Sequence, residues 1–207
     1  MDSLDSNEII DYKRVQGDNM IRTFIAAPIP DEIRKKLKDI QAELRKHETG
    51  AVRWVNPEGI HLTFHFLGEI EESGVTGLGE MLKEAGSACR SFSYRVRGLG
   101  AFPNLSRPRV FWAGLETGSE AEKLHELLKA GLVRLRYPVE SRAFSPHLTL
   151  GRVKSPSGLA AVIGQVEKLK ETELGEFETR EVILFKSELR PGGALYTPLV
   201  TQPLNRA

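Results

Sequence analysis

The chain contains a single cysteine, Cys89, among its 207 residues. An intrachain disulfide is therefore impossible, and a zinc site built from several cysteines is excluded as well. A lone cysteine favours a reducing compartment. No apolar run approaches the roughly 20 residues that span a bilayer, and the N-terminus lacks the basic and then apolar order of a signal peptide. We therefore expect a cytoplasmic protein with no membrane partner.

A strong excess of either charge is also missing, since the formal net charge is only +1. The first 19 residues, however, carry five acidic and two basic side chains, a net charge of −3 that leaves +4 for the remainder. A modestly basic body fits a small anionic ligand or the end of a nucleic acid better than a long duplex. We expect residues 1–19 to form a flexible extension outside the fold.

The remaining composition is that of an ordinary globular protein, with 40% apolar and 28% charged residues. Residues 20–207 are long enough for one large domain or for two small lobes that share a core. We predict a single domain with two lobes.

Two four-residue words in the chain nearly repeat each other: HLTF at His61 and HLTL at His147. Alternate side chains of a strand point to the same face, so the histidine and threonine of each word would lie together. The apolar residues between them would point the other way. Each word therefore predicts a half-buried strand with its polar side chains toward a cleft.

The pattern around each word predicts the order strand, helix, strand, helix, strand. Phe24 and Val110 each lie 37 residues before the histidine of their word, whereas Phe92 and Phe177 follow theirs by 31 and 30 residues. This register indicates an internal repeat with halves at about 20–105 and 106–207. The predicted strands lie at 24–27, 60–67, 92–96, 110–114, 147–153 and 177–185. Four helices are predicted: one that begins at residue 31, one that runs toward residue 89, and two at 119–136 and 157–169.

Two similar lobes related by a pseudo-twofold axis would bring the words face to face across a cleft. The predicted strands alternate polar and apolar residues, which favours antiparallel sheets with one open face. We therefore predict an α+β fold of two pseudo-symmetric lobes, each a mainly antiparallel sheet with helices outside and with the active-site cleft between them.

Two histidines facing one cleft suit the hydrolysis of a phosphodiester. The reaction needs a base that takes a proton from water and an acid that gives one to the leaving oxygen. Histidine can fill either role because its unperturbed pKa is about 6.5. Threonine hydroxyls can donate hydrogen bonds to the non-bridging phosphate oxygens. This scheme requires no metal and no other cofactor.

Together with their flanks, the two words resemble the two-histidine (2H) phosphoesterases, and within them the RNA 2′,3′-cyclic phosphodiesterases, also called 2′-5′ RNA ligases. The resemblance covers nearly all of residues 20–199. The similar flanks include VRWV at 52–55, FLGE at 66–69, GAFPN at 100–104, PRVFW at 108–112 and SEL at 187–189.

The resemblance implies that 2′,3′-cyclic phosphates at RNA ends, or on nucleosides, are opened to 2′-phosphates. It implies His61 as proton donor to the departing oxygen and His147 as the base that activates water, although the repeat alone leaves the two roles interchangeable. Thr63 and Thr149 would hold the phosphate, and Arg152 would contact it. A monomer is the default expectation.

Two further residues are candidates for substrate binding. His65 replaces a lysine that is frequent in the family, and in a regular strand it shares the face of His61 at the edge of the cleft. Phe102 lies in a predicted exposed loop and can stack on a base. By contrast, His47 and His125 lie on predicted helices and are expected to be exposed.

Three alternatives remain open at this stage. The first is the reverse chemistry, which joins RNA ends through a 2′-5′ bond. The second is a module that binds RNA ends without catalysis, which would need neither an acid nor a base. The third is a zinc site of His61, His65 and His147, although no HExxH or similar ligand spacing accompanies them.

Overall fold

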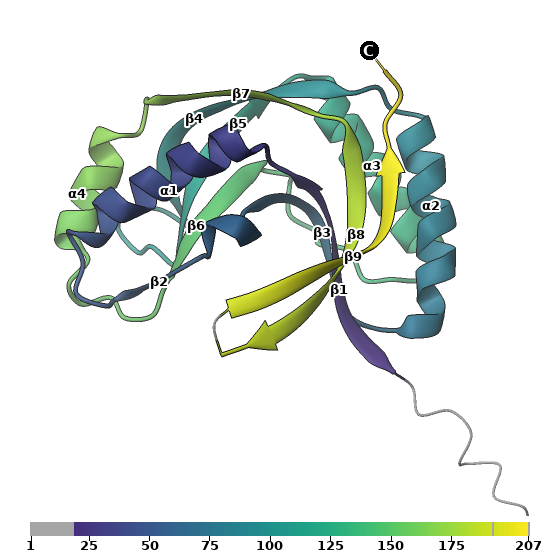
Figure 1. Cartoon of the computed structure of the whole chain (residues 1–207), viewed down its shortest axis with the longest axis horizontal. Coiled ribbons are helices and arrows are strands. Elements are labelled where there is room, and N and C mark those ends of the chain that lie inside the picture. Colours follow the sequence, from purple (N-terminus) through teal and green to yellow (C-terminus); the bar gives the residue numbers. More distant parts are fainter. Residues whose placement is uncertain (1–18, 192, 207) are drawn as a thin grey trace, which may run out of the picture.

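The computed structural model describes residues 19–191 and 193–206 (Figure 1). The predicted flexible extension therefore lies outside the described residues, except for Asn19. The carbonyl of Asn19 accepts a hydrogen bond of 3.1 Å from the backbone N–H of Glu72, and its side-chain amide contacts the carboxylate of the same residue. Asn19 thus belongs to the fold.

Within these residues the chain forms nine strands, four α-helices and two short 3-10 helices. The strands are β1 (Met20–Pro28), β2 (Val52–Trp54), β3 (His61–Glu71), β4 (Phe92–Phe102), β5 (Val110–Thr117), β6 (His147–Val153), β7 (Glu173–Thr179), β8 (Glu181–Arg190) and β9 (Gly193–Pro203). The helices are α1 (Asp31–Arg45), α2 (Val75–Ser87), α3 (Ser119–Arg134), α4 (Ala160–Lys168), η1 (Pro57–Gly59) and η2 (Glu72–Gly74).

The strands form one sheet in the order β7-β4-β5-β6-β3-β1-β8-β9, and β2 pairs with β6 outside this path. All pairs of named strands are antiparallel. The strands that carry the two words, β3 and β6, are neighbours in the middle of the sheet, where Leu62 lies opposite Leu148. The predicted α+β fold with antiparallel strands is confirmed.

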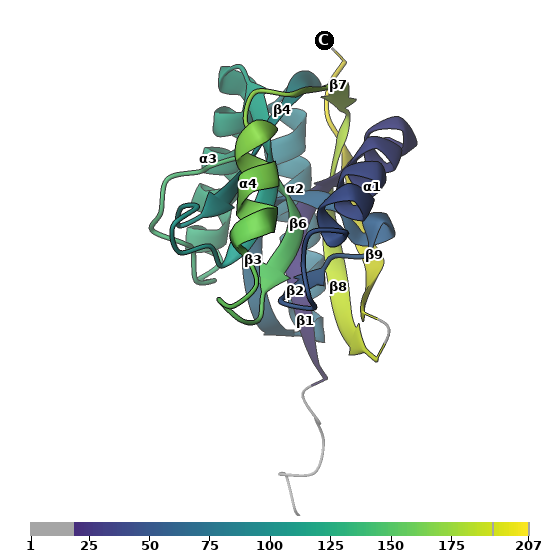
Figure 2. The ribbon, with the colours of Figure 1, turned by 90° about the vertical axis from the view of Figure 1, so that its left-hand side faces the viewer.

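Each lobe combines segments from both halves of the sequence. The first lobe contains β3, β1, β8 and β9, with α2 and α3 packed against it; the second contains β6, β5, β4 and β7, with α1 and α4. Figures 1 and 2 show these two helix pairs at separate ends of the sheet. β4, from the first half of the sequence, pairs with β5, the first strand of the second half. In the same way β8, from the second half, pairs with β1. Each lobe therefore needs strands from both halves.

The single strand predicted at 177–185 is wrong, because the chain there forms two strands. β7 ends at Thr179 and pairs with β4, whereas β8 begins at Glu181 and pairs with β1. The chain therefore passes from one lobe to the other at Arg180. Residues on both sides of this crossing have strand character, so alternation alone does not reveal it. The short strand β2 and the last strand β9 were not predicted.

Helix α1 illustrates how the apolar pattern positions the elements. Ile33, Leu37 and Leu44 recur at helical spacing and are buried, and burial of each such side chain contributes about 1.5–3 kcal/mol. Gln41 lies in the same buried stripe. Across the described part of the chain, no helix has both the length and the apolar character needed to cross a membrane.

Candidate active site

His61 and His147 each begin a strand, and each ring is held by the backbone just before it. The Nδ1 atom of His61 lies 2.8 Å from the carbonyl oxygen of Gly59. The Nδ1 atom of His147 lies 2.8 Å from the carbonyl oxygen of Ser145. Since a carbonyl only accepts, each Nδ1 carries the proton, and the Nε2 atom of each neutral ring is free to accept one.

Burial favours the neutral form of both imidazoles in the free protein. Burial lowers the pKa of His61 to about 4, the hydrogen bond to Gly59 opposes this shift, and the charge of His147 adds to it. Burial also lowers the pKa of His147, against the hydrogen bond to Ser145, and the charge of Arg152 lowers it further. The two rings are thus close enough for the charge on one to disfavour charge on the other.

The threonines lie beside the histidines, as the words predict. Thr63 and Thr149 are half-buried, whereas Leu62 and Leu148 between the polar residues are fully buried. These two leucines lie opposite each other in an antiparallel pair. Thr63 is therefore next to His147 across the two strands, and His61 is next to Thr149. The structure therefore brings the four polar residues to one face of the sheet.

The expectation that His65 shares this face is wrong. Thr63 lies opposite Ala26 and His65 lies opposite Ile25, which leaves Phe64 as the extra residue of a β-bulge. A bulge reverses the alternation that follows it. The side chain of His65 is therefore buried against α3.

The surroundings of His65 correct two further expectations. Its Nε2 atom donates to the carbonyl of His125 at 3.1 Å, and the two rings stack at 4.4 Å. His125 is consequently buried, not exposed as predicted. The zinc site of three histidines is contradicted as well, because His65 lies on the opposite face from His61 and His147.

A matching bulge in β6 determines where Arg152 points. Thr149 lies opposite Trp112 and Gly151 lies opposite Phe111, so Leu150 is the extra residue. Arg152 therefore returns to the face of His147. Its charge lowers the pKa of His147, in keeping with a position near that ring. Regular alternation would instead have turned Arg152 toward the apolar side.

Aromatic rings enclose both histidines. Phe24 stacks on His61 with 4.6 Å between ring centroids, and Tyr196 meets the same ring edge-on at 5.1 Å. Phe102 meets His147 edge-on at 4.9 Å. Phe102 is the last residue of β4, not part of an exposed loop, but it does lie beside the predicted site. Sequence reasoning missed the contact of Phe24, which has no local signal because β1 joins β3 only in the folded sheet.

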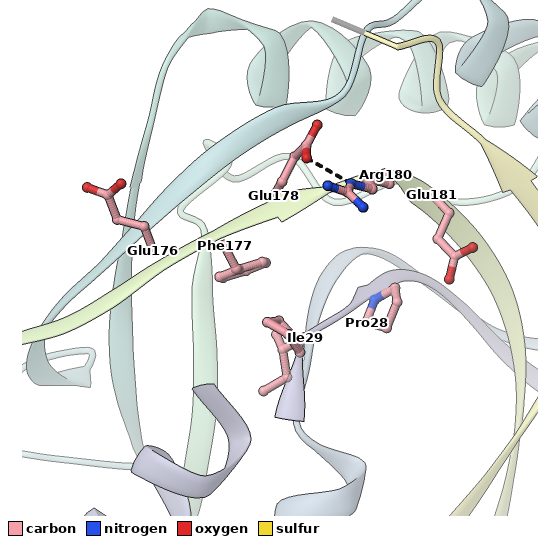
Figure 3. A pocket seen from close by; sticks show the side chains of 8 residues that line it. Pro28, Ile29, Glu176, Phe177, Glu178, Arg180 and Glu181 are labelled. Atoms are coloured by element: carbon pink, nitrogen blue, oxygen red, sulfur yellow. Dashed lines mark hydrogen bonds and ion pairs between the residues drawn. The ribbon is translucent and has the colours of Figure 1, made fainter. Parts of the chain in front are cut away.

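Two cavities differ in their suitability for a phosphate. A cavity of about 270 Å³ is lined by His147, Phe102 and Trp112, though not by His61, and its charged residues are Arg97, Lys170 and Glu116. A larger cavity of about 550 Å³ is lined by Glu176, Glu178 and Glu181, together with Pro28, Ile29, Pro30, Phe177 and Arg180 (Figure 3). In Figure 3 the Arg180 side chain is paired with Glu178. The carboxylates of the larger cavity repel anions, so the site at the histidines is the better candidate.

The family model described as LigT-like phosphoesterase matches residues 27–112 and 115–196. Each of these two stretches includes one His-Thr word. The chain belongs to this family. It is therefore a phosphoesterase, and the pair of histidines in the middle of the sheet is its candidate catalytic centre.

Curated relatives support this membership over most of the chain. A protein of Archaeoglobus fulgidus is 36% identical over 86% of this chain and 98% of its own length. A protein of Thermotoga maritima is 35% identical over 86% of this chain and 93% of its own. A third, from Methanothermobacter thermautotrophicus, is 31% identical over 86% and 96%. All three are named RNA 2′,3′-cyclic phosphodiesterase.

Solved structures of the family share the fold. A crystal structure of a Thermus thermophilus protein has a TM-score of 0.76 and 31% identity, and covers 90% of this chain and 99% of its own. E. coli LigT, solved in complex with 3′-AMP, has a TM-score of 0.72 and 25% identity over the same shares. The arrangement of two lobes is thus that of the family.

Proposed function

We propose that this phosphoesterase opens 2′,3′-cyclic phosphates at RNA ends, or on nucleosides, to 2′-phosphates without a metal. One observation carries the proposal: two neighbouring imidazoles have Nδ1 bonded to a backbone carbonyl, and so present Nε2 to the same face. One can act as base and the other as acid. The names of the three curated relatives support the choice of substrate.

The proposed reaction is an in-line displacement at phosphorus. The Nε2 atom of His147 takes a proton from water as the water oxygen bonds to phosphorus. The bond from phosphorus to the 3′ oxygen breaks, and His61 gives that oxygen the proton held on its Nε2 atom. The phosphate remains on the 2′ oxygen. Exchange with solvent then removes the proton from His147 and returns one to His61.

The assignment of His147 as the base and His61 as the acid follows the family resemblance, since burial disfavours the protonated form of both rings and lowers the pKa of His61 to about 4. The nearby charge of Arg152 disfavours the protonated form of His147, and a base must be neutral before the reaction. Burial acts against the protonated form of His61, so its role as acid depends on the bound substrate. An anionic phosphate beside the ring raises the pKa of His61 and supplies that condition.

Thr63, Thr149 and Arg152 would stabilise the phosphate in this scheme. The threonine hydroxyls donate to the non-bridging oxygens, and the guanidinium group neutralises the charge that builds on them. We propose a monomer as the active unit, because one chain supplies both histidines and both threonines.

The test is to incubate the protein with a short RNA that ends in a 2′,3′-cyclic phosphate, with EDTA present. We expect a 2′-phosphate product, and loss of about 10² to 10⁴ in rate for His61→Ala and for His147→Ala. A need for added metal would contradict the mechanism, and a 3′-phosphate product would reverse the leaving group. A module that only binds would retain affinity and show no turnover in the wild type.

The rival direction is ligation, which uses the same four residues. It is tested in the same assay by adding an RNA with a 5′-hydroxyl and looking for a product joined by a 2′-5′ bond.

A further inference from the structure

Two arginines lie directly opposite each other in the sheet at the edge of the site. Arg53 of β2 pairs with Arg152 of β6, and both side chains are exposed. Opposite residues of an antiparallel pair point to the same face with Cβ atoms about 5 Å apart, and like charges there destabilise the pair. This arrangement therefore costs stability unless an anion lies between the charges.

The protein itself does not supply that anion in the part of the chain that the structure describes. Neither arginine has a carboxylate oxygen within 4.0 Å. The carboxylate of Glu48 is close to β2, but it accepts hydrogen bonds from the backbone N–H of Val52 and from the indole N–H of Trp54, both at 3.2 Å. It is thus engaged with the residues on both sides of Arg53.

Other arginines of the sheet are paired differently. Arg95 and Arg97 both have Glu116 and Glu173 within 4.0 Å, and Arg22 lies opposite Glu69. The pairing of Arg53 with a second arginine is an exception to this pattern. Two neighbouring guanidinium groups without a carboxylate partner among the described residues are suited to bind an external anion.

The position of the pair indicates which anion it meets. The bulge at Leu150 puts Arg152 on the face of His147, and its charge lowers the pKa of that ring, so Arg152 is positioned to meet the reacting phosphate of the proposed function. Arg53 lies one strand further along the same face. A substrate with a second phosphate near the cyclic one would reach both guanidinium groups.

We propose that Arg53, next to Arg152, binds the phosphodiester that precedes the cyclic phosphate, so that the preferred substrate is an RNA end and not a mononucleotide. The guanidinium fork suits such a contact because it can bind two phosphate oxygens at once. This inference rests on the proposed function and specifies its substrate.

The experiment compares two substrates with the same terminal nucleotide: a nucleoside 2′,3′-cyclic monophosphate and the dinucleotide that carries the same cyclic end. We expect Arg53→Gln to lower kcat/KM for the dinucleotide about tenfold, mainly through KM, since a charged hydrogen bond is lost. Hydrolysis of the mononucleotide should change by less than about twofold, because the preceding phosphate is absent.

Salt dependence gives a second readout. Each neutralised phosphate of a single strand contributes about 0.7 to the slope of log affinity against log salt. For the wild type this slope should therefore be steeper with the dinucleotide than with the mononucleotide. This difference should disappear in Arg53→Gln. The matched control is Arg95→Gln, which removes an exposed arginine of the sheet that has its own carboxylates and should alter neither substrate.

Stability measurements separate this role from a structural one. Arg53→Gln relieves the repulsion, so its Tm should equal or exceed that of the wild type, and Arg53→Lys should restore most of the preference for the dinucleotide. Equal losses on both substrates, no loss on either, or a lower Tm with general loss of activity would each overturn the inference. Failure of the wild type to hydrolyse either substrate would instead count against the proposed function.

Discussion

Phe66 of β3 and Arg152 of β6 occupy equivalent positions, each five residues after the histidine of its word and each on the cleft face. A bulge that follows Thr63 in one strand and Thr149 in the other brings them there. Phe66 is 50% exposed. The repeat thus retains the geometry and differs in chemistry, with an apolar ring on the side of His61 and a cation on the side of His147.

The first prediction concerns Arg152 and the pKa of His147. Arg152→Gln should raise the pKa of His147, because a positive charge that disfavours the imidazolium is removed. We expect the acidic limb of the pH profile of kcat/KM for the free enzyme to move upward and kcat/KM at pH 7 to fall about 10²-fold. NMR titration of the histidine rings checks the shift directly. A downward shift, or none, would mean that the two side chains are not close.

The second prediction concerns the threonines. Thr63→Val and Thr149→Val keep the shape of each side chain but remove a donor to the phosphate, so each should lower kcat by about tenfold or more. Thr63→Ser and Thr149→Ser retain the hydroxyl and should keep most of the rate. Steady-state kinetics on the cyclic substrate distinguish the two pairs. Equal activity of a valine variant and the wild type would show that its threonine does not contact the transition state.

The third prediction concerns stability below neutral pH. Burial lowers the pKa of His65 to about 4, whereas a histidine in the unfolded chain has a pKa of about 6.5. The unfolded state therefore binds the proton first, and the contribution of neutral His65 to stability is lost as the pH falls from about 6.5 toward 4. This single group accounts for at most about 3 kcal/mol. We expect the free energy of unfolding, measured in urea, to fall across this range.

The matched variant for this test is His65→Leu. It should be less stable than the wild type at pH 7, because the hydrogen bond to the carbonyl of His125 is lost, but its stability should depend less on pH between 6.5 and 4. An unchanged dependence on pH would show that His65 is not the group that titrates.

The fourth prediction concerns Gln41, which holds the bulge of β6 from the other side of the sheet. Its side-chain amide donates to the carbonyls of Leu150 and Val55 at 2.7 and 2.9 Å, and Leu150 is the extra residue that turns Arg152 to the cleft. Gln41→Leu should lower stability by about 1–3 kcal/mol, and should also lower kcat/KM because Arg152 is displaced.

Leu37→Ala is the control for this effect, since Leu37 is buried on the same helix but its apolar side chain makes no hydrogen bond to the bulge. It should cost about 2–5 kcal/mol of stability and leave kcat/KM of the folded protein nearly unchanged. If both variants reduce activity equally, Gln41 contributes only to folding.

The sequence by itself determined the elements whose signals are local. The two His-Thr words alternate within four residues, so their strand character and the shared face of His61 with Thr63, and of His147 with Thr149, could be predicted. The apolar stripe of α1 and the duplicated spacing were equally readable. The family resemblance could be recognised for the same reason, because it depends on short stretches of neighbouring residues.

Only the tertiary structure decided what depends on the neighbouring strands. The bulges at Phe64 and Leu150 arise from register with β1 and β5, and they send His65 to the buried side and Arg152 to the cleft. Alternation along one strand contains no information about an extra residue relative to its partner. The burial of His125, the crossing at Arg180 and the opposition of Arg53 and Arg152 have the same cause. Each is set by which distant segments pair, and that choice is made by packing of the whole sheet.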